Sequence, residues 1–404
     1  MIGFTVGDQF DANAGIITAI GAHTDSPCLR IKAVSSFVKG KYLVINTQPY
    51  GGGLWHTWFD RDLGLAGRAI LKGKDGSIES KLFCINEPIA RIPNLAIHLT
   101  AGKERETFGP NLHEHAKAII SLDPDIVDLK PKAGYETEIA SRIHPFLLQM
   151  IAKSMGVDAE TIEDVEMQLI DVQPSCLSGA SKEFLNSGRL DNLCSSYQSL
   201  RALADSKTVG EKNIKLAMLF DHEEVGSMST AGAGSSMFMD TLKRVFDTLA
   251  AAQGVPLGSG SSLFMQALRN SFVVSIDMAH ALHPNYSSKH ESQMAPTING
   301  GIVIKHNANQ RYATNSVSAT LFRRIGKLAC VPVQEFSVRS DSGCGSTIGP
   351  IIATLSGILT VDVGTPQFSM HSIREMMGSH DAYTGYLHLL ATYEQHPLLT
   401  ININ

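Results

Sequence analysis

Four apolar segments that each end in acids or histidines constrain the fold of this chain most strongly. They occupy residues 15–25, 214–224, 272–280 and 358–366. Each is nearly continuous in Ile, Val, Leu and Ala, which is typical of strands buried on both faces of a sheet. The sequence therefore predicts several strands that carry polar side chains to their ends.

Between these strands the sequence has the periodicity of amphipathic helices. In residues 190–205, apolar side chains such as Leu190, Leu193 and Tyr197 recur three and four positions apart. Residues 315–329, and the segment from 373 to about 393, have similar patterns. Alternating strands and helices predict an α/β fold with an open twisted sheet flanked by helices. In such sheets, functional groups gather at the carboxyl ends of the strands.

Length and composition limit the possible functions. The chain has 404 residues, which favours two domains, and its net charge of −5 gives no basic surface for nucleic acid. Apolar runs are too short for a membrane span, and the first residues lack a basic region followed by an apolar one, so a cytoplasmic protein without a secretory signal is expected. The six cysteines form no CxxC pair, which favours a reduced compartment and argues against a cysteine-ligated zinc site.

Residues 32–173 have a different pattern from the rest of the chain. They contain short β-like segments and turn signals, and end in a predicted helix near residues 144–156. We therefore expect an inserted, mostly β domain at 32–173, and a main domain made of residues 1–31 and 174–404.

The polar residues at the strand ends form a candidate metal site. Imidazole nitrogen and carboxylate oxygen are the usual ligands of a catalytic zinc ion. Three carboxylates and two imidazoles exceed what one such ion needs, and fit two metal ions about 3.5–4 Å apart with one bridging carboxylate. Two divalent cations, three carboxylates and one bridging hydroxide would make the site nearly neutral. The candidate ligands are His23, Asp191, Glu224, Asp277 and His371.

The adjacent acids Glu223 and Glu224 suggest a division of roles. One would bind metal, and the other would stay free of metal to accept a proton from water and pass it to a leaving amine. The residues alone do not decide which acid does which. Asp25, two positions after His23, is a candidate for orienting the imidazole, with a simple polar turn as the alternative.

Six segments together resemble the aspartyl aminopeptidases, cytosolic metallopeptidases that remove acidic residues from peptide amino termini. They are GAHTDSPCLRIK, SGRLDNL, DHEEVGS, SIDMAHALHPNY, NQRYATN and MHSIREM, in this order. YGGGLWHTWFDRDL and RIPNLAIHLT extend the resemblance into the inserted region, so that it covers essentially the whole chain. It implies a zinc-exopeptidase-like main domain and an inserted domain that mediates dimerisation.

The resemblance also implies roles for the site residues. Two divalent metal ions are expected, zinc first, with manganese or cobalt as alternatives. One ion would be held by His23, Asp191 and Asp277, and the other by Asp191, Glu224 and His371. Glu223 matches the general base, acting on a metal-bridging hydroxide, and Asp25 matches the neighbour that orients His23.

Substrate recognition is implied at three further positions. Lys305 matches the cation that would bind the acidic side chain, and Tyr312 lies close to it in sequence; Arg311 and Arg339 are rival cations. His98 matches a histidine that reaches the active site of a neighbouring subunit, although a lone histidine in an apolar run is more often a core residue. This implies a homo-oligomer, a dodecamer built from dimers, acting on peptides without nucleic acid or membrane partners.

The sequence alone is also compatible with other functions and with a shortened amino terminus. The chain begins several tens of residues later than the family pattern, so we expect a truncated or naturally short amino terminus. The alternatives are another co-catalytic zinc aminopeptidase or deacylase of different specificity, and an inactive truncated subunit. Residues 342–350 precede an expected helix whose amino end is a candidate for facing a substrate carboxylate, with a tight turn as the alternative.

Overall fold

The computed structural model describes residues 1–130, 138–256 and 260–399. The chain forms two compact units. The first comprises Met1–Ser26, Ser175–Met370 and Arg374–Asn404, and the second comprises Pro27–Pro174 and His371–Ile373. The first unit contains two sheets, and the second contains one sheet with its own hydrophobic core.

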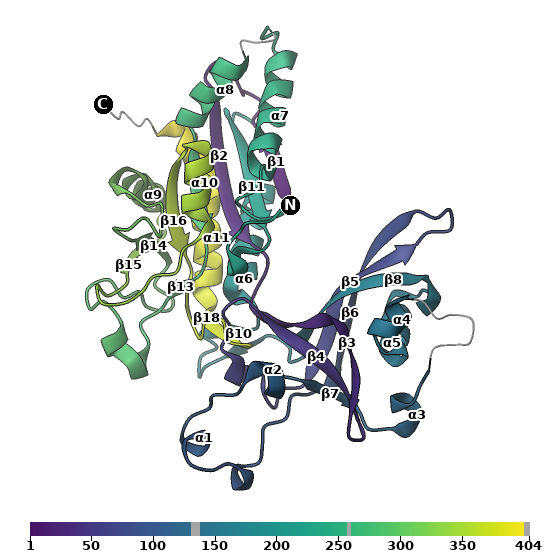
Figure 1. Ribbon diagram of the computed structural model, residues 1–404. Helices are drawn as coiled ribbons and strands as arrows, with labels where there is room; N and C mark the ends of the chain where they lie inside the picture. The colour runs from purple at the N-terminus through teal and green to yellow at the C-terminus, as the bar shows by residue number, and fades with distance from the viewer. Residues whose placement is uncertain (131–137, 257–259, 400–404) are drawn as a thin grey trace. The chain divides into compact units, whose positions relative to one another are not determined.

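A mostly parallel sheet of seven strands forms the centre of the first unit (Figure 1). Strands β11, β2, β12 and β16 run parallel to one another, β1 pairs antiparallel with β11, and β14 pairs antiparallel with β16 and parallel with β15. Every residue of β11 and β12 is buried, as the continuous apolar segments predict. In spatial order the strands are β1 (Ile2–Val6), β11 (Asn213–Phe220), β2 (Ile16–His23), β12 (Phe272–Ile276), β16 (Leu359–Gly364), β14 (Ile302–His306) and β15 (Val333–Ser337).

Helices cover both faces of this sheet. On one face, Ile17 and Ala19 of β2 share a core with α7 (Met237–Ala252), α8 (Gly260–Arg269) and α10 (Ile348–Ser356). On the other, Ile20 and Ala22 share a core with α6 (Leu190–Asp205), α9 (Ser316–Leu328) and α11 (Ser379–Gln395). Successive residues of a strand point to opposite faces, so β2 contributes to both cores. The predicted α/β class, with an open sheet between helices, is confirmed.

A smaller sheet of five short strands completes the first unit. Its order is β13 (Ala279–His280), β17 (Pro366–Phe368), β18 (Glu375–Gly378), β10 (Phe184–Ser187) and β9 (Cys176–Ser178). The expected helix from residue 373 therefore begins later, because residues 375–378 pair with β10 and β17 as strand β18. Helix α11 starts only at Ser379.

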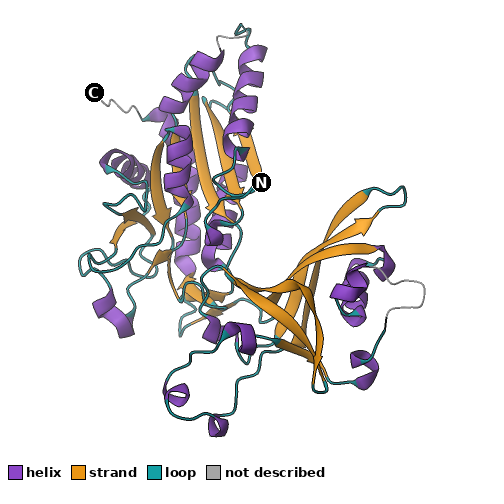
Figure 2. Ribbon diagram, viewed as in Figure 1, coloured by secondary structure: helices purple, strands orange, loops and turns teal. Residues whose placement is uncertain are grey.

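The second unit is built on an antiparallel sheet of six strands (Figure 2). Its order is β6 (Ile78–Ala90), β5 (Leu63–Lys72), β8 (Ile162–Asp171), β3 (Cys28–Lys39), β4 (Tyr42–Tyr50) and β7 (Ala118–Ser121). Helix α5 (Pro145–Met155) packs on it through Leu147 and Ile151. The expectation that this region ends in a helix was wrong, because strand β8 follows α5 and pairs with both β3 and β5.

Several sequence signals set the ends of α5. His144 caps its amino end by accepting a hydrogen bond from the Phe146 N–H, Pro145 occupies its first turn, and Gly156 ends it in the left-handed conformation. The shorter helices of this unit are α1 (Lys103–Glu106), α2 (Leu112–His115), α3 (Pro124–Val127) and α4 (Glu138–Arg142). Single 3₁₀ turns in the two units lie at Trp55–Trp58, Ile97–Leu99, Ala159–Thr161, Glu223–Val225, Pro284–Lys289 and His396–Leu398.

A helix that crosses a membrane needs about 20 consecutive, mostly apolar residues. Across residues 1–130, 138–256 and 260–399, no helix is long and apolar enough to cross a bilayer.

Two fully buried histidines make the stability of the first unit depend on pH. His388 stacks on Phe322, and His396 contacts the Thr18 hydroxyl through Nδ1 at 2.8 Å and packs on Phe272. Burial lowers the pKa of each imidazole to about 4. In the unfolded chain each histidine takes up a proton near pH 6.5, whereas the folded chain does so only near pH 4.

The free energy of unfolding should therefore fall as the pH drops from about 6.5 towards 4. The expected loss between pH 7 and pH 5 is on the order of 2 kcal/mol per histidine. Equilibrium denaturation of His396→Gln should show a pH dependence reduced by about that amount. The same change at the exposed His113 is the control. An identical pH dependence in His396→Gln and the unsubstituted protein would contradict the assignment.

Candidate metal centre

The parallel register of the sheet brings the strand-end residues to one edge. His23 is the last residue of β2 and pairs with Phe220, the last residue of β11. Ser275 of β12 pairs with Gly21, so Asp277 follows its strand at the level of His23. Carboxyl ends of parallel strands are where ligand sites form in open α/β sheets.

A tight turn after β11 directs the two adjacent glutamates. His222 adopts a left-handed conformation with φ of 62°, and Glu223–Val225 form a single 3₁₀ turn. The carboxylate of Asp25 accepts hydrogen bonds from the N–H groups of both glutamates, each at 3.1 Å. Asp25 thus fixes the backbone of the glutamate pair as well as contacting His23.

The imidazole of His23 is oriented towards the acids. Its Nδ1 lies 3.0 Å from the carbonyl oxygen of Asp25 and 3.4 Å from the carboxylate Oδ1 of the same residue. The other ring nitrogen, Nε2, lies 3.3 Å from Asp191, 3.4 Å from Asp277 and 4.0 Å from Glu223. A histidine that binds metal through one nitrogen typically bonds a carbonyl or carboxylate through the other, and this geometry has that form.

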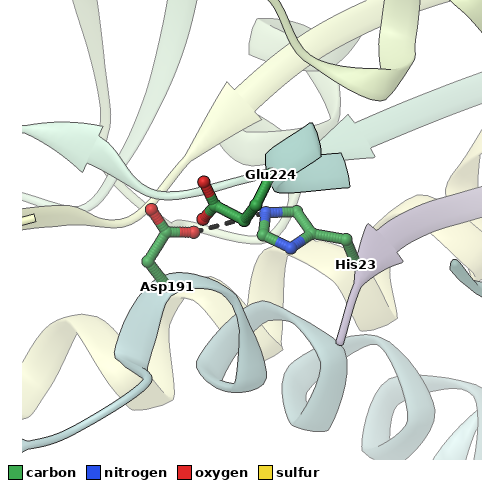
Figure 3. A group of neighbouring side chains, drawn as sticks. All are labelled: His23, Asp191 and Glu224. Carbon is green, nitrogen blue, oxygen red and sulfur yellow. Dashed lines mark ion pairs between the residues drawn. The ribbon is translucent and has the colours of Figure 1, made fainter. Parts of the chain in front are cut away.

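Figure 3 shows three of the predicted ligands converging from different elements. His23 comes from the end of β2, Asp191 from the first turn of α6, and Glu224 from the turn after β11. One ligand atom from each lies within 4.8 Å of the other two. The set of one nitrogen and two carboxylate oxygens is appropriate for a divalent metal ion such as zinc.

Glu375 supports this group, although the sequence analysis did not single it out. Its buried carboxylate accepts a hydrogen bond from the Asp191 N–H at 2.9 Å, and the Ser26 hydroxyl donates to the Asp191 carbonyl at 2.5 Å. Glu375 lies within the MHSIREM segment, so its position near a predicted ligand was a usable signal. An acid inside a strand has no periodicity that would reveal such a role.

The electrostatics of the cluster show an excess of negative charge. Burial opposes protonation of His23, but hydrogen bonds to Asp191, Asp25 and Asp277 outweigh it and raise the pKa of the imidazole well above its usual range. Burial, followed by repulsion from Asp277, raises the pKa of Glu223 to about 7. The donor atoms and their charge therefore fit divalent cations, which would offset the repulsion among the carboxylates.

His371 lies in the second unit. It adopts a left-handed conformation with φ of 66°, and its Nδ1 lies 2.8 Å from the Gly52 carbonyl oxygen. It is not a member of the group formed by His23, Asp191 and Glu224. Its assignment as a fifth ligand stays a prediction.

Lys305 and Tyr312 lie together in the first unit. Both are buried, and the Lys305 ammonium lies 5.4 Å from the centre of the Tyr312 ring and 3.7 Å from Asp277 Oδ2. The rival cations have other roles, because Arg311 donates to the Cys344 carbonyl and Arg339 forms a double ion pair with Asp341. Lys305 is the cation in contact with a predicted metal ligand.

His98 does not lie in the core of its unit. It is exposed, within the 3₁₀ turn at Ile97–Leu99. Its neighbours Leu95, Ile97 and Leu99 are exposed by 60%, 53% and 71%. The apolar character of this segment therefore does not reflect packing within one copy of the chain.

Comparison with known proteins adds to this geometry. The model of the family described as "Aminopeptidase I zinc metalloprotease (M18)" matches residues 1–393. The chain belongs to this family. The resemblance seen in the sequence motifs is confirmed, and so is the predicted class of enzyme, a hydrolase of the metallo-aminopeptidase type.

Individual relatives agree with the family assignment. A probable aspartyl aminopeptidase of Ricinus communis is 47% identical over 98% of this chain and 84% of its own length. The aspartyl aminopeptidase of Aspergillus oryzae is 43% identical over 94% and 81%. The "Cryo-EM structure of the Ape4 and Nbr1 complex" superposes with a TM-score of 0.92 at 38% identity, covering all of this chain and 76% of the other. The "Structure of S. cerevesiae mApe1 dodecamer" has a TM-score of 0.81 at 27% identity, covering 98% and 83%.

The contacts of Asp25 lead to a prediction about metal affinity. Asp25→Ala should weaken metal binding about 10- to 100-fold, because it removes the carboxylate that contacts His23 Nδ1 at 3.4 Å and accepts from both glutamate N–H groups. Competition with a chromophoric chelator measures this affinity. Asp11→Ala, at an exposed turn where the carboxylate accepts from the Asn13 N–H, is the control. Unchanged affinity in Asp25→Ala would mean that these contacts do not organise the site.

Proposed function

We propose that this chain is a metallo-aminopeptidase that releases acidic residues from the amino termini of peptides. The observation that carries the proposal is the proximity of a buried cation, Lys305, to a cluster of metal-type ligands. The aspartyl aminopeptidases among its relatives support the choice of substrate.

We expect two divalent ions at the acidic cluster. On the matching of motifs, His23, Asp191 and Asp277 would hold one ion, and Asp191, Glu224 and His371 would hold the other. Zinc is the first candidate because the family is described as zinc metalloproteases, and manganese and cobalt accept the same ligands. When bound, such ions act as Lewis acids that polarise a carbonyl and lower the pKa of water to about 7.

Glu223 is the proton carrier of the proposed reaction. Its carboxylate accepts a proton from the attacking water, whose oxygen forms a bond to the scissile carbonyl carbon. The carbon–nitrogen bond then breaks as Glu223 returns the proton to the leaving amine. The Glu223 carboxylate lies 4.0 Å from His23 Nε2, beside the predicted ligands, which is the position that such a proton carrier needs. Asp25 holds this residue through its backbone N–H.

Lys305 sets the specificity. A buried ammonium is costly unless an anion accompanies it, and Asp277 at 3.7 Å supplies part of that compensation. The carboxylate of an aspartyl or glutamyl side chain would complete it by a charge-assisted hydrogen bond. This is why we favour acidic substrates over the alternative of a neutral aminopeptidase or a deacylase.

We also propose a homo-oligomer. The structure named for the S. cerevisiae mApe1 dodecamer shows that a related chain assembles in this way. The exposed Leu95, Ile97 and Leu99 give this chain an apolar segment that a second copy would cover. His98 lies in that segment and would contribute to the neighbour's site, and the second unit would mediate dimerisation. We also propose a cytoplasmic location, since the six cysteines of the sequence form no CxxC pair.

The proposed function is tested by turnover of aspartyl-, glutamyl-, asparaginyl- and leucyl-amides, with and without a chelator and with zinc or manganese restored. Metal-dependent release restricted to the acidic substrates is expected. Glu223→Gln should lower kcat by about 10²- to 10⁴-fold while metal content, measured by mass spectrometry, stays unchanged. Two bound metals with no turnover on any substrate would favour an inactive subunit. Preference for leucyl-amide would favour the alternative specificity.

Lys305→Met should remove the preference for acidic residues. Methionine keeps much of the length and apolar character of the side chain without its charge, so kcat/KM for aspartyl-amide should fall about tenfold to a hundredfold. The value for the isosteric asparaginyl-amide should change little. Lys243→Met is the control, because that exposed ammonium donates to Asp247 on α7 instead. Equal losses on both substrates in Lys305→Met would indicate a structural role.

A further inference from the structure

Asp362 is a buried acid that the proposed reaction does not use. It lies within β16 and is fully inaccessible to solvent. Its carboxylate accepts hydrogen bonds from the Ala313 N–H at 2.6 Å and from the Thr347 hydroxyl at 2.7 Å. These donors belong to two different loops, one after β14 and one before α10. Asp362 therefore joins both loops to the central sheet.

The loop after β14 is attached to Asp362 at two successive residues. Besides the Ala313 N–H, the Thr314 hydroxyl accepts from the Asp362 N–H at 3.0 Å and lies 3.3 Å from the Asp362 carbonyl oxygen. Tyr312 comes directly before these two residues. Its ring position is thus set by a backbone segment that is bonded to Asp362.

The loop before α10 contacts the residue that precedes Tyr312, which is Arg311. The guanidinium of Arg311 donates to the Cys344 carbonyl at 3.0 Å, and the Ser346 hydroxyl donates to the Arg311 carbonyl at 3.3 Å. Thr347 follows Ser346 and binds Asp362. The two loops therefore hold each other, and Asp362 anchors both to β16.

The first turn of α10 is packed closely against the Asp362 carboxylate. A methyl group on Gly349 would lie 2.2 Å from Oδ2 and 2.4 Å from Oδ1, so only glycine fits there. Thr347 occupies the cap position of α10, yet its hydroxyl bonds Asp362 and makes no capping bond to its own helix. The amino end of α10 was expected to be a candidate for facing a substrate carboxylate. It lies instead next to the carboxylate of Asp362.

The strand of Asp362 also supports Lys305. Strand β14 pairs with β16 at Val303 with Gly364 and at Ile304 with Val363, and Lys305 follows directly. A methyl group on Gly364 would lie 3.0 Å from the Lys305 Cε, so the lysine side chain passes close to that strand. Lys305 and the Tyr312 loop are therefore arranged around the same part of β16.

We propose that Asp362 is a positioning residue that sets specificity, by holding the Tyr312 loop and the amino end of α10 so that Tyr312 lies against Lys305. The inference rests on the proposed function of Lys305 as the group that binds the acidic side chain. Asp362 acts through Tyr312 and does not touch the substrate. Its loss should loosen the acidic pocket and leave the metal ligands in place.

Asp362→Asn is the most direct test. The amide keeps the size of the side chain, but it removes the negative charge that strengthens the hydrogen bonds from the Ala313 N–H and the Thr347 hydroxyl. The ratio of kcat/KM for aspartyl-amide over asparaginyl-amide should fall about tenfold, mainly through a higher KM for aspartyl-amide. Metal content and kcat/KM for asparaginyl-amide should stay within about twofold of the unsubstituted protein.

Thr347 provides a second test if Asp362→Asn fails to fold. Thr347→Val removes the hydroxyl with little change of shape and should lower the same ratio, whereas Thr347→Ser keeps the hydroxyl and should preserve it. Thr354→Val is the matched control on the same helix, because that hydroxyl donates to the Pro350 carbonyl and lies far along α10. Asp381→Asn controls for the loss of a buried acid, since Asp381 accepts the N–H groups of Asn299 and Gly301.

The outcomes separate this inference from the proposed function. A lower ratio in Asp362→Asn and Thr347→Val, but not in Thr347→Ser or the two controls, supports a positioning role. A ratio unchanged in folded Asp362→Asn or Thr347→Val overturns it, as does an equal loss on both substrates, which a merely structural role would produce. If the unsubstituted protein does not prefer aspartyl- over asparaginyl-amide, the proposed function fails first and this inference is overturned with it.

Discussion

Parallel pairing of β2 with β11 and β12 is the constraint on which the site depends. Their register places His23 level with the end of β11 and brings Asp277 beside it. Parallel strands require crossover connections, usually helical, and one such helix, α6, carries Asp191 in its first turn at the same edge. The chemistry is therefore assembled by backbone hydrogen bonds between strands that are buried on both faces. A one-residue slip of β2 would move His23 away from this edge and also exchange the faces to which Ile17 and Ile20 point.

The carboxyl edge of the sheet also concentrates negative charge, which lowers the stability of the fold unless other groups offset it. Acids that are buried close together repel each other and lose hydration. The protein offsets part of this cost by sharing His23 among Asp191, Asp277 and Glu223, and by placing Lys305 near Asp277. Divalent cations would supply the rest, so that metal binding and stability of this edge are coupled. Burial in the first place, and repulsion from Asp277 in the second, raise the pKa of Glu223.

Much of this arrangement could be predicted from the sequence, because it follows from local patterns. Continuous apolar segments identified the central strands, and the polar residues at their ends included His23 and Glu224 of the cluster, whereas Asp191 lies in the first turn of a helix. Residues 375–378 were misassigned because strand β18 is stabilised by pairing with β10, a segment almost 200 residues away. His98 was difficult for a different reason. An apolar run has the same composition whether it packs inside its own chain or is exposed for contact with another.

Asp25 and Asp362 illustrate why supporting residues are harder to predict than ligands. Each is a buried acid whose carboxylate accepts backbone N–H groups from another segment, at Glu223 and Glu224 in one case and at Ala313 in the other. A carboxylate is suited to this task because it accepts several hydrogen bonds at once and strengthens each with its charge. Asp25 was recognised because it lies two positions after His23. Asp362 has no such neighbour, because its partners Thr314 and Thr347 are 48 and 15 residues away in the sequence. Such contacts depend on the tertiary structure, and they hold in place the loops whose side chains we propose to lie at the metal ions and the substrate.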